Sequence, residues 1–270
     1  AGIQALNGAS TYRGGTALSR GTLQLGNAGG LGSTNGVLGM VGGALNLNGF
    51  NPTVGALAGP AGIVSNGPGS ATLTVNQAVN TTYAGILAVG AGTVALTKSG
   101  TGALTLSGNN TATGATTVNG GTLNLAYNNA GTGTLGGGAL IVNTGATVVA
   151  TVGNALGWSG ASWTTNITLR FGTLATAVAG ADNGWKTTMY MTGGTLSSNV
   201  PYGYFSMGYG LTAGYGAAFF VYATNVASTI SANLKVRDTD PAGILFDVER
   251  GTGTTDLNVT GSILDQATGG

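Results

Sequence analysis

The stretch "LTKSGTGALTLSGNNTATGATTVNGGTLNLA", residues 96–126, decides the fold. Apolar and small polar residues alternate in short runs, as at Leu104 and Leu106 and again at Leu123 and Leu125. This period of two is typical of a β-strand with one buried face. Gly-Gly, Asn-Gly and Ser-Gly pairs separate the runs and supply the positive φ angles that turns require. The stretch therefore predicts short strands joined by tight turns.

The same phrase opens the chain, since residues 1–26 align with residues 101–126 without a gap. Ten residues of the first copy recur 100 positions later, namely Gly2, Leu6, Gly8, Thr11, Gly14, Thr16, Gly21, Thr22, Leu23 and Leu25. Repetition of a strand-turn-strand unit favours a solenoid over a sandwich or a barrel, because each coil buries its small apolar face only against its neighbours.

We therefore expect an all-β fold, a right-handed parallel β-solenoid in which short coils of about 20–25 residues stack into an elongated rod. The expected handedness follows from the general preference of parallel crossover connections. Leu104, Leu106, Leu123 and Leu125 are the predicted core stack. Because no residue window combines a 3.6-residue period with good helix formers, we expect no helix.

Composition excludes several classes of protein. The 270 residues include 53 glycines, which weaken helical interiors, while a hydrophobic fraction of 42% and a charged fraction of 6% argue against disorder. Eight basic and seven acidic side chains leave no electrostatic footprint for nucleic acid. Cysteine and histidine are absent from the sequence, which removes thiolate and imidazole chemistry. We assign no catalytic, cofactor-binding or metal-binding residue and expect a non-enzymatic protein.

The repeated phrase resembles a known family. "LTKSGTGALTLSGNNTATGATTVNGGTLNL" is similar to the autotransporter-associated β-strand repeat, as are "LNLNGFNPTVGALAG" at 45–59 and "TTYAGILAVGAG" at 81–92. The resemblance covers residues 1–126 best, and residues 127–200 and 254–270 more loosely. It implies a bacterial protein that is extracellular or displayed at the cell surface, with a parallel β-helix of the passenger type.

We expect a single solenoid over residues 1–270, with larger and more highly charged side chains in residues 185–256. A protruding loop is predicted near Pro201. The aromatic residues of this part are Trp185, Tyr190, Tyr202, Tyr204, Phe205, Tyr209, Tyr215, Phe219, Phe220 and Tyr222. Tyr202, Tyr204, Phe205, Tyr209 and Tyr215 form a candidate interaction patch for a glycan or a cell surface. The alternative is that they lie in the interior or at a subunit contact.

The segment "KVRDTD" at 235–240 is the cluster that could support acid/base or cation chemistry. Asp238 and Asp240 share one side of an extended segment, so they could serve a polysaccharide-cleaving site or hold a calcium ion. The alternative is a solvated face of weak ion pairs.

Three functions remain open on the sequence alone. The first is an extracellular structural protein that forms a fibre, stalk or sheath, because the chain begins within a repeat phrase and its end coils could pair head-to-tail with another copy. The second is an adhesin-type passenger that contacts glycan or another cell. The third is a polysaccharide-active enzyme centred on Asp238 and Asp240. No nucleic-acid partner is expected, and the apolar stretch at 217–223 is too short for a transmembrane helix.

Overall fold

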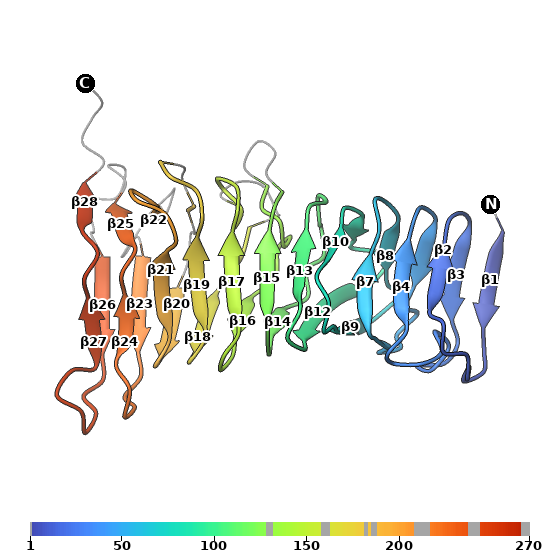
Figure 1. The fold of residues 1–270 in the computed structure, drawn as a ribbon, viewed down its shortest axis with the longest axis horizontal. Coiled ribbons are helices and arrows are strands. Elements are labelled where there is room, and N and C mark those ends of the chain that lie inside the picture. The colour runs from blue at the N-terminus through green and yellow to red at the C-terminus, as the bar shows by residue number, and fades with distance from the viewer. Residues whose placement is uncertain are drawn as a thin grey trace.

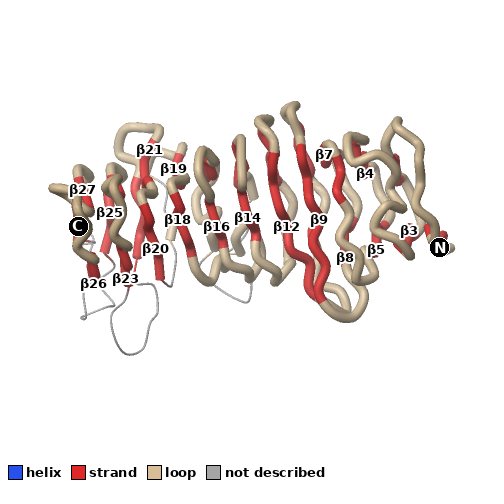
Figure 2. Tube along the Cα trace, turned by 90° about the horizontal axis from the view of Figure 1, so that it is seen from below, coloured by secondary structure: helices blue, strands red, loops and turns tan. Residues whose placement is uncertain are grey.

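The protein folds into short parallel strands joined by turns. The computed structural model describes residues 2–127, 132–157, 163–180, 183–184, 188–207, 217–236 and 244–265, and within these ranges it contains strands and turns without a helix (Figure 2). Strand pairing is parallel in each of the five sheets. No helix in the described ranges could span a membrane. The expected parallel β-solenoid is confirmed.

The strands follow one another along a rod, with the N-terminus at one end and the C-terminus at the other (Figure 1). The longest sheet contains β6 (Thr53–Val54), β9 (Ser70–Asn76), β12 (Thr93–Ser99), β14 (Thr116–Val118), β16 (Leu140–Val142), β18 (Ile167–Arg170), β20 (Thr188–Thr192), β23 (Ala217–Val221) and β26 (Ile244–Val248). The eight-stranded sheet contains β10 (Thr81–Tyr83), β13 (Ala103–Leu106), β15 (Thr122–Leu125), β17 (Thr147–Ala150), β19 (Thr173–Thr176), β21 (Thr195–Ser198), β24 (Ser228–Ile230) and β27 (Leu257–Val259).

Smaller sheets complete the coils. The five-stranded sheet contains β1 (Ile3–Leu6), β3 (Thr22–Leu25), β5 (Ala44–Asn46), β8 (Ile63–Ser65) and β11 (Ile86–Leu87). One three-stranded sheet contains β2 (Thr16–Leu18), β4 (Val37–Met40) and β7 (Ala56–Ala58). The other contains β22 (Tyr204–Met207), β25 (Asn233–Val236) and β28 (Ile263–Asp265). Successive strands such as β8, β9 and β10 belong to three different sheets, so the chain passes three sides in each coil there.

The coils differ in length. Leu104 pairs with Leu123, whereas Thr195 pairs with Thr229, so one coil advances by 19 residues (123 − 104) and another by 34 (229 − 195). The expected length of about 20–25 residues therefore describes part of the rod. Longer coils place their extra residues in loops, because the strands that pair remain only two to seven residues long.

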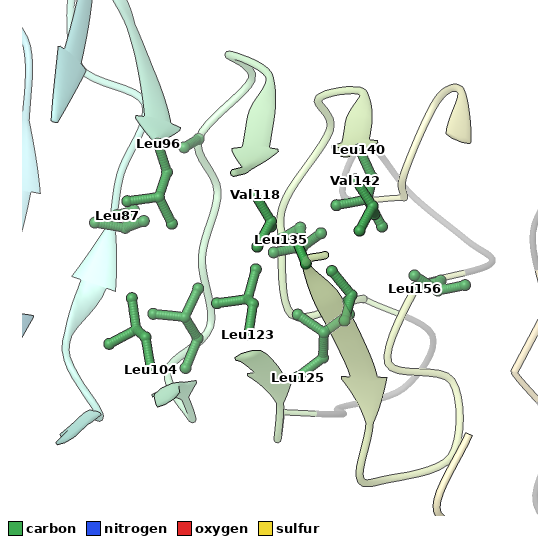
Figure 3. Packing of buried hydrophobic residues seen from close by; sticks show 14 of the residues in the cluster. Leu87, Leu96, Leu104, Val118, Leu123, Leu125, Leu135, Leu140, Val142 and Leu156 are labelled. Carbon is green, nitrogen blue, oxygen red and sulfur yellow. The ribbon is translucent and has the colours of Figure 1, made fainter. Parts of the chain in front are cut away.

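Alternation along each strand places the apolar side chains inside. In β13 and β15 the burial alternates residue by residue, and Leu104, Leu106, Leu123 and Leu125 have no exposed area. Figure 3 shows Leu104, Leu123 and Leu125 in the shared interior with Leu96 and Val118 from the nine-stranded sheet. Each fully buried leucine contributes about 1.5–3 kcal/mol of hydrophobic stabilisation. The core is thus a continuous stack along the rod.

Buried amide side chains join neighbouring coils at the corners. The Asn110 carbonyl oxygen accepts a hydrogen bond from the Leu87 amide at 2.7 Å, and its Nδ2 donates to the carbonyl oxygen of Thr134 at 2.6 Å. Gln77 Nε2 donates to the carbonyl oxygen of Ala103 at 2.6 Å. Because a buried amide is costly unless it is bonded, these side chains hold neighbouring coils in register beside strands such as β11 and β13.

Candidate functional site

The predicted interaction patch falls only partly within the described residues. Tyr202, Tyr204 and Phe205 are described, whereas Tyr209 and Tyr215 lie outside the described ranges. Tyr204 and Phe205 begin β22, and Tyr202 lies two residues before it. The described part of the patch therefore lies at the start of one short strand.

Tyr202 is a highly exposed aromatic residue at a turn before β22. Its side chain is 82% exposed, and its backbone has a φ of 61°, a conformation that is unfavourable for a bulky residue. Strained backbone of this kind often occurs at functional sites. The neighbouring Gly180 amide donates to the Tyr202 carbonyl oxygen at 3.4 Å, which connects this turn to the preceding coil.

Tyr204 is half-buried and contacts both Gly180 and Lys235. Its hydroxyl group donates to the carbonyl oxygen of Gly180 at 3.3 Å, and the ammonium group of Lys235 lies 5.1 Å from its ring centre. The cation-π contact ties β22 to β25. Phe205 points the opposite way, has no exposed area and belongs to the core, because successive side chains of a strand alternate between the two faces. Phe205 therefore offers no surface to a partner.

A second aromatic group lies on the outer face of the nine-stranded sheet. The Tyr190 ring stacks on the Phe220 ring with centroids 5.7 Å apart and planes at 22°. The Tyr190 and Tyr222 rings are 6.3 Å apart with planes at 8°. Tyr190 and Phe220 are directly paired in β20 and β23, and Tyr222 follows the end of β23. We call Tyr190, Phe220 and Tyr222 the outer aromatic row.

Two exposed carboxylates border the outer aromatic row. Asp247 in β26 is the paired neighbour of Phe220, and Glu249 follows two residues later on the same outward side. A Glu249 carboxylate oxygen accepts a hydrogen bond from the Ala223 amide at 3.4 Å. The sequence indicates an aromatic-rich segment here, but the grouping depends on pairing between residues about 30 positions apart, which is not evident before the coil length is known.

Lys98 is a buried cation, and its burial was not predicted from the sequence. It lies in β12 between the paired neighbours Val75 and Val118, and its side chain has no exposed area. Its ammonium group donates to the carbonyl oxygens of Ser99, Gly100 and Gly120 at 2.8, 3.0 and 3.1 Å. Burial lowers the pKa of Lys98 from its ordinary 10.5 to about 8. Lys98 continues the alternation of Val94 and Leu96, and this pattern indicates that its side chain points inward.

Tyr83 is a second buried titratable group. Its hydroxyl group donates to the carbonyl oxygen of Gly62 at 3.0 Å, and the side chain has no exposed area. Burial raises the pKa of Tyr83 well above its usual range, and the weaker bond to the carbonyl oxygen of Ile86 acts in the opposite direction. Tyr83 and Lys98 contact backbone rather than open surface, so we treat both as structural groups.

The acid/base candidates cannot be placed. Asp238 and Asp240 lie outside the described ranges, so an enzymatic or calcium-binding role for them stays a prediction. Within the described part of the chain, no three acidic side chains gather in a way that could hold a metal ion. An open depression of about 340 Å³ is lined by Asn35, Val37, Gly55, Ala56, Asn76, Ala78 and Val79. It carries no ionisable side chain.

The fold defines a class of protein, the extended parallel β-solenoid. Comparison with known families then gives the kind of solenoid: residues 1–25 and 96–125 match the passenger-associated-transport-repeat. The resemblance to autotransporter-associated β-strand repeats is therefore confirmed, and the matched segments contain β1 to β3, the second half of β12, and β13 to β15. The matched residues form strands and turns of the solenoid.

One curated relative is an adhesin. Over 130 residues the chain is 34% identical to the adhesin BmaC autotransporter of Brucella suis biovar 1 (strain 1330), an alignment that covers 48% of this chain. The aligned part makes up 4% of the length of that relative. No solved structure matches the chain.

Proposed function

We propose that this chain is a segment of an adhesin-type autotransporter passenger, displayed at the bacterial cell surface or released outside the cell, and that it acts as a non-enzymatic rigid spacer with contact surfaces on its sides. The observation that carries the proposal is the presence of two passenger-associated transport repeats within one continuous β-solenoid. The similarity to a protein described as an adhesin supports it further.

The physical properties of the rod suit a spacer. Its core is a stack of small apolar layers, and its coils are linked by parallel backbone hydrogen bonds along the axis. In such a quasi-one-dimensional protein each coil contacts mainly its neighbours. Coils can therefore be added without a change in the packing of the others. Exposed aromatic side chains such as Tyr202 and Tyr222 then provide apolar contact area with a polar tip.

Surface display tests the proposal. The chain is fused to an outer-membrane anchor on a non-adherent bacterium, and attachment of the bacteria to cultured epithelial cells is counted. A Leu104→Asp variant, which disrupts the core stack, serves as the control for folding. We expect attachment with the native chain and its loss with the control. Equal attachment by bacteria that carry the anchor alone would contradict the adhesin assignment.

End-to-end assembly is a second candidate function. Among the described residues the outermost strands of the sheets, such as β1 and β27, pair on one side only, and unpaired strand edges accept further strands. Additional coils of the same polypeptide or another copy could satisfy these edges, and a non-closing contact between copies would produce a fibre, stalk or sheath. Electron microscopy of the purified chain decides the point: unbranched filaments support head-to-tail assembly, and isolated short rods contradict it.

A further inference from the structure

The outer surface of the nine-stranded sheet changes character along the rod. Paired outward positions run through Thr97, Thr117, Ile141, Thr168, Tyr190, Phe220 and Asp247. The first four are β-branched side chains, three of them threonines, and such residues are common on the face of a sheet. The next two are aromatic and the last is acidic. Backbone pairing alone does not require this change, because Thr168 and Tyr190 occupy equivalent positions.

The aromatic part of this surface is accessible from the side of the rod. Tyr222 is 42% exposed, and Tyr190 and Phe220 are partly exposed although each touches a neighbouring ring. Tyr190 lies on one coil, and the nearly parallel rings of Phe220 and Tyr222, two residues apart on the following coil, both stack on it, so the three rings form one cluster across two coils. An exposed aromatic cluster is a typical binding surface, because it offers a large apolar area at a low cost in side-chain entropy.

We propose that the outer aromatic row binds an uncharged glycan across these two coils. The inference rests on the proposed adhesin function and names its ligand. Sugar rings carry apolar C–H groups on their faces and hydroxyl groups at their edges, so they pack on aromatic rings while their edges seek hydrogen bonds. The ring spacings of 5.7 and 6.3 Å both cross the step between the same two coils, so the three rings offer one compact contact area to a sugar.

The charges beside the row select the kind of glycan. Asp247 and Glu249 are exposed on β26 and directly after it, next to the rings, and their oxygens can accept hydrogen bonds from sugar hydroxyl groups. The same carboxylates repel uronic acids and sialic acids. Arg170 is further away, because its paired neighbour Thr192 lies between it and the coil of Tyr222. Arg250 is exposed directly after Glu249, so among these described side chains two carboxylates stand against one cation, and the surface beside the row favours neutral over acidic glycans.

The test uses the full 270-residue chain and oligosaccharides of defined charge. Cellohexaose and chitohexaose are the neutral extended probes, a galacturonic acid hexamer is the acidic probe, and a hexalysine peptide represents a basic protein partner. Binding is measured by saturation-transfer NMR and by titration calorimetry. We expect binding of at least one neutral probe, with weaker binding of the acidic hexamer. The absence of binding by both neutral probes, or equal or tighter binding of the acidic hexamer or the lysine peptide, overturns the proposal.

A matched set of variants locates the site. Replacing Tyr190, Phe220 and Tyr222 by threonine extends the row of small β-branched residues, so the fold should be kept. Ile141→Thr is the control, because Ile141 occupies the same row away from the rings. We expect at least about tenfold weaker neutral-glycan binding in the triple variant, or about 1.4 kcal/mol, and no change in the control. Equal losses in both overturn the assignment to these rings.

Attachment of displayed cells separates this inference from the adhesin proposal. If the triple threonine variant attaches as well as the native chain, the spacer and adhesin assignment is kept and the glycan-binding role of the outer aromatic row is rejected. If the native chain binds cellohexaose or chitohexaose but confers no attachment, the glycan-binding role of the outer aromatic row is kept and the adhesin assignment is rejected.

Discussion

The side-chain ammonium group of Lys98 donates a hydrogen bond to the carbonyl oxygen of Gly120, 3.1 Å away on the following coil. Two further bonds, to the carbonyl oxygens of Ser99 and Gly100, use its remaining protons. A cation thus occupies an inward row between Val75 and Val118. It is tolerated because three backbone acceptors at the corner of the coil replace its hydration.

Loss of this ammonium group should loosen the coils around it. Lys98→Met keeps most of the buried stem but removes a donor from the carbonyl oxygens of Ser99, Gly100 and Gly120, of which that of Ser99 still accepts from the Gln77 amide, and this loss costs about 1–3 kcal/mol. Because a solenoid opens locally, the effect should appear as faster amide hydrogen exchange in β12 and β14. Arg20→Met is the control, since Arg20 is exposed and its loss should cost less than about 0.5 kcal/mol. Unchanged exchange in Lys98→Met would contradict the structural role.

Stability should depend on pH through Lys98 and Tyr83. The folded pKa of Lys98 is about 8 and its ordinary value is 10.5, so between these values the unfolded chain binds more protons and stability should rise with pH. The pKa of Tyr83 is raised in the folded state. Above its ordinary value of 10.0, the folded chain therefore binds more protons and stability should fall. The two effects together predict a maximum near pH 10.

Denaturant unfolding from pH 7 to 11 checks this profile. In Lys98→Met the rise above pH 8 should disappear, and in Tyr83→Phe the fall above pH 10 should become smaller. A native profile that declines steadily from pH 8 would show that the three carbonyl bonds hold the charged form of Lys98 more strongly than burial disfavours it.

The local pattern of the repeat predicted strands accurately. The two copies that lie 100 residues apart form equivalent strands, since β1, β2 and β3 correspond to β13, β14 and β15. Even the register agrees, because Ile3 pairs with Thr22 as Ala103 pairs with Thr122. Alternation and turn glycines are local signals, and they act the same way wherever the phrase occurs.

The side of the rod on which each strand lies could not be predicted. β1 and β3 belong to the five-stranded sheet, whereas their counterparts β13 and β15 belong to the eight-stranded sheet. The phrase specifies which side chains point inward, but the coils between the copies differ in length, so the second copy begins on another side. For the same reason the outer aromatic row could not be predicted, because its residues become neighbours only when the length of the coil between them is known.

Replacing a turn glycine by alanine should cost more stability where the backbone of a neighbouring coil lies close to the added Cβ atom. Gly121 has a φ of 61°, and a Cβ atom there would lie 2.5 Å from the carbonyl oxygen of Gly102. Gly145 has a φ of 73° with no atom within 4 Å of such a Cβ. Gly145→Ala should cost about 1–2 kcal/mol from backbone strain alone. Gly121→Ala should cost a further ~1–3 kcal/mol, because backbone of the preceding coil must shift.

Melting temperatures and local amide exchange of the two glycine variants give the comparison. Similar losses in both would show that the coils separate easily, and that close stacking at the corner contributes little to stability.

Tyr202 allows stability and function to be separated. Its backbone has a φ of 61° and its side chain is 82% exposed, so the fold gains little from the ring and bears the strain. Asparagine tolerates this conformation, and Tyr202→Asn should therefore stabilise the protein by up to about 1 kcal/mol. If the exposed ring contacts a partner, the same variant should reduce attachment of displayed cells. Tyr12→Asn is the control, because Tyr12 is exposed at 40% in another part of the rod. A variant that is less stable than the native chain would contradict the strain argument, and a stabilised variant with full attachment would remove Tyr202 from the contact surface.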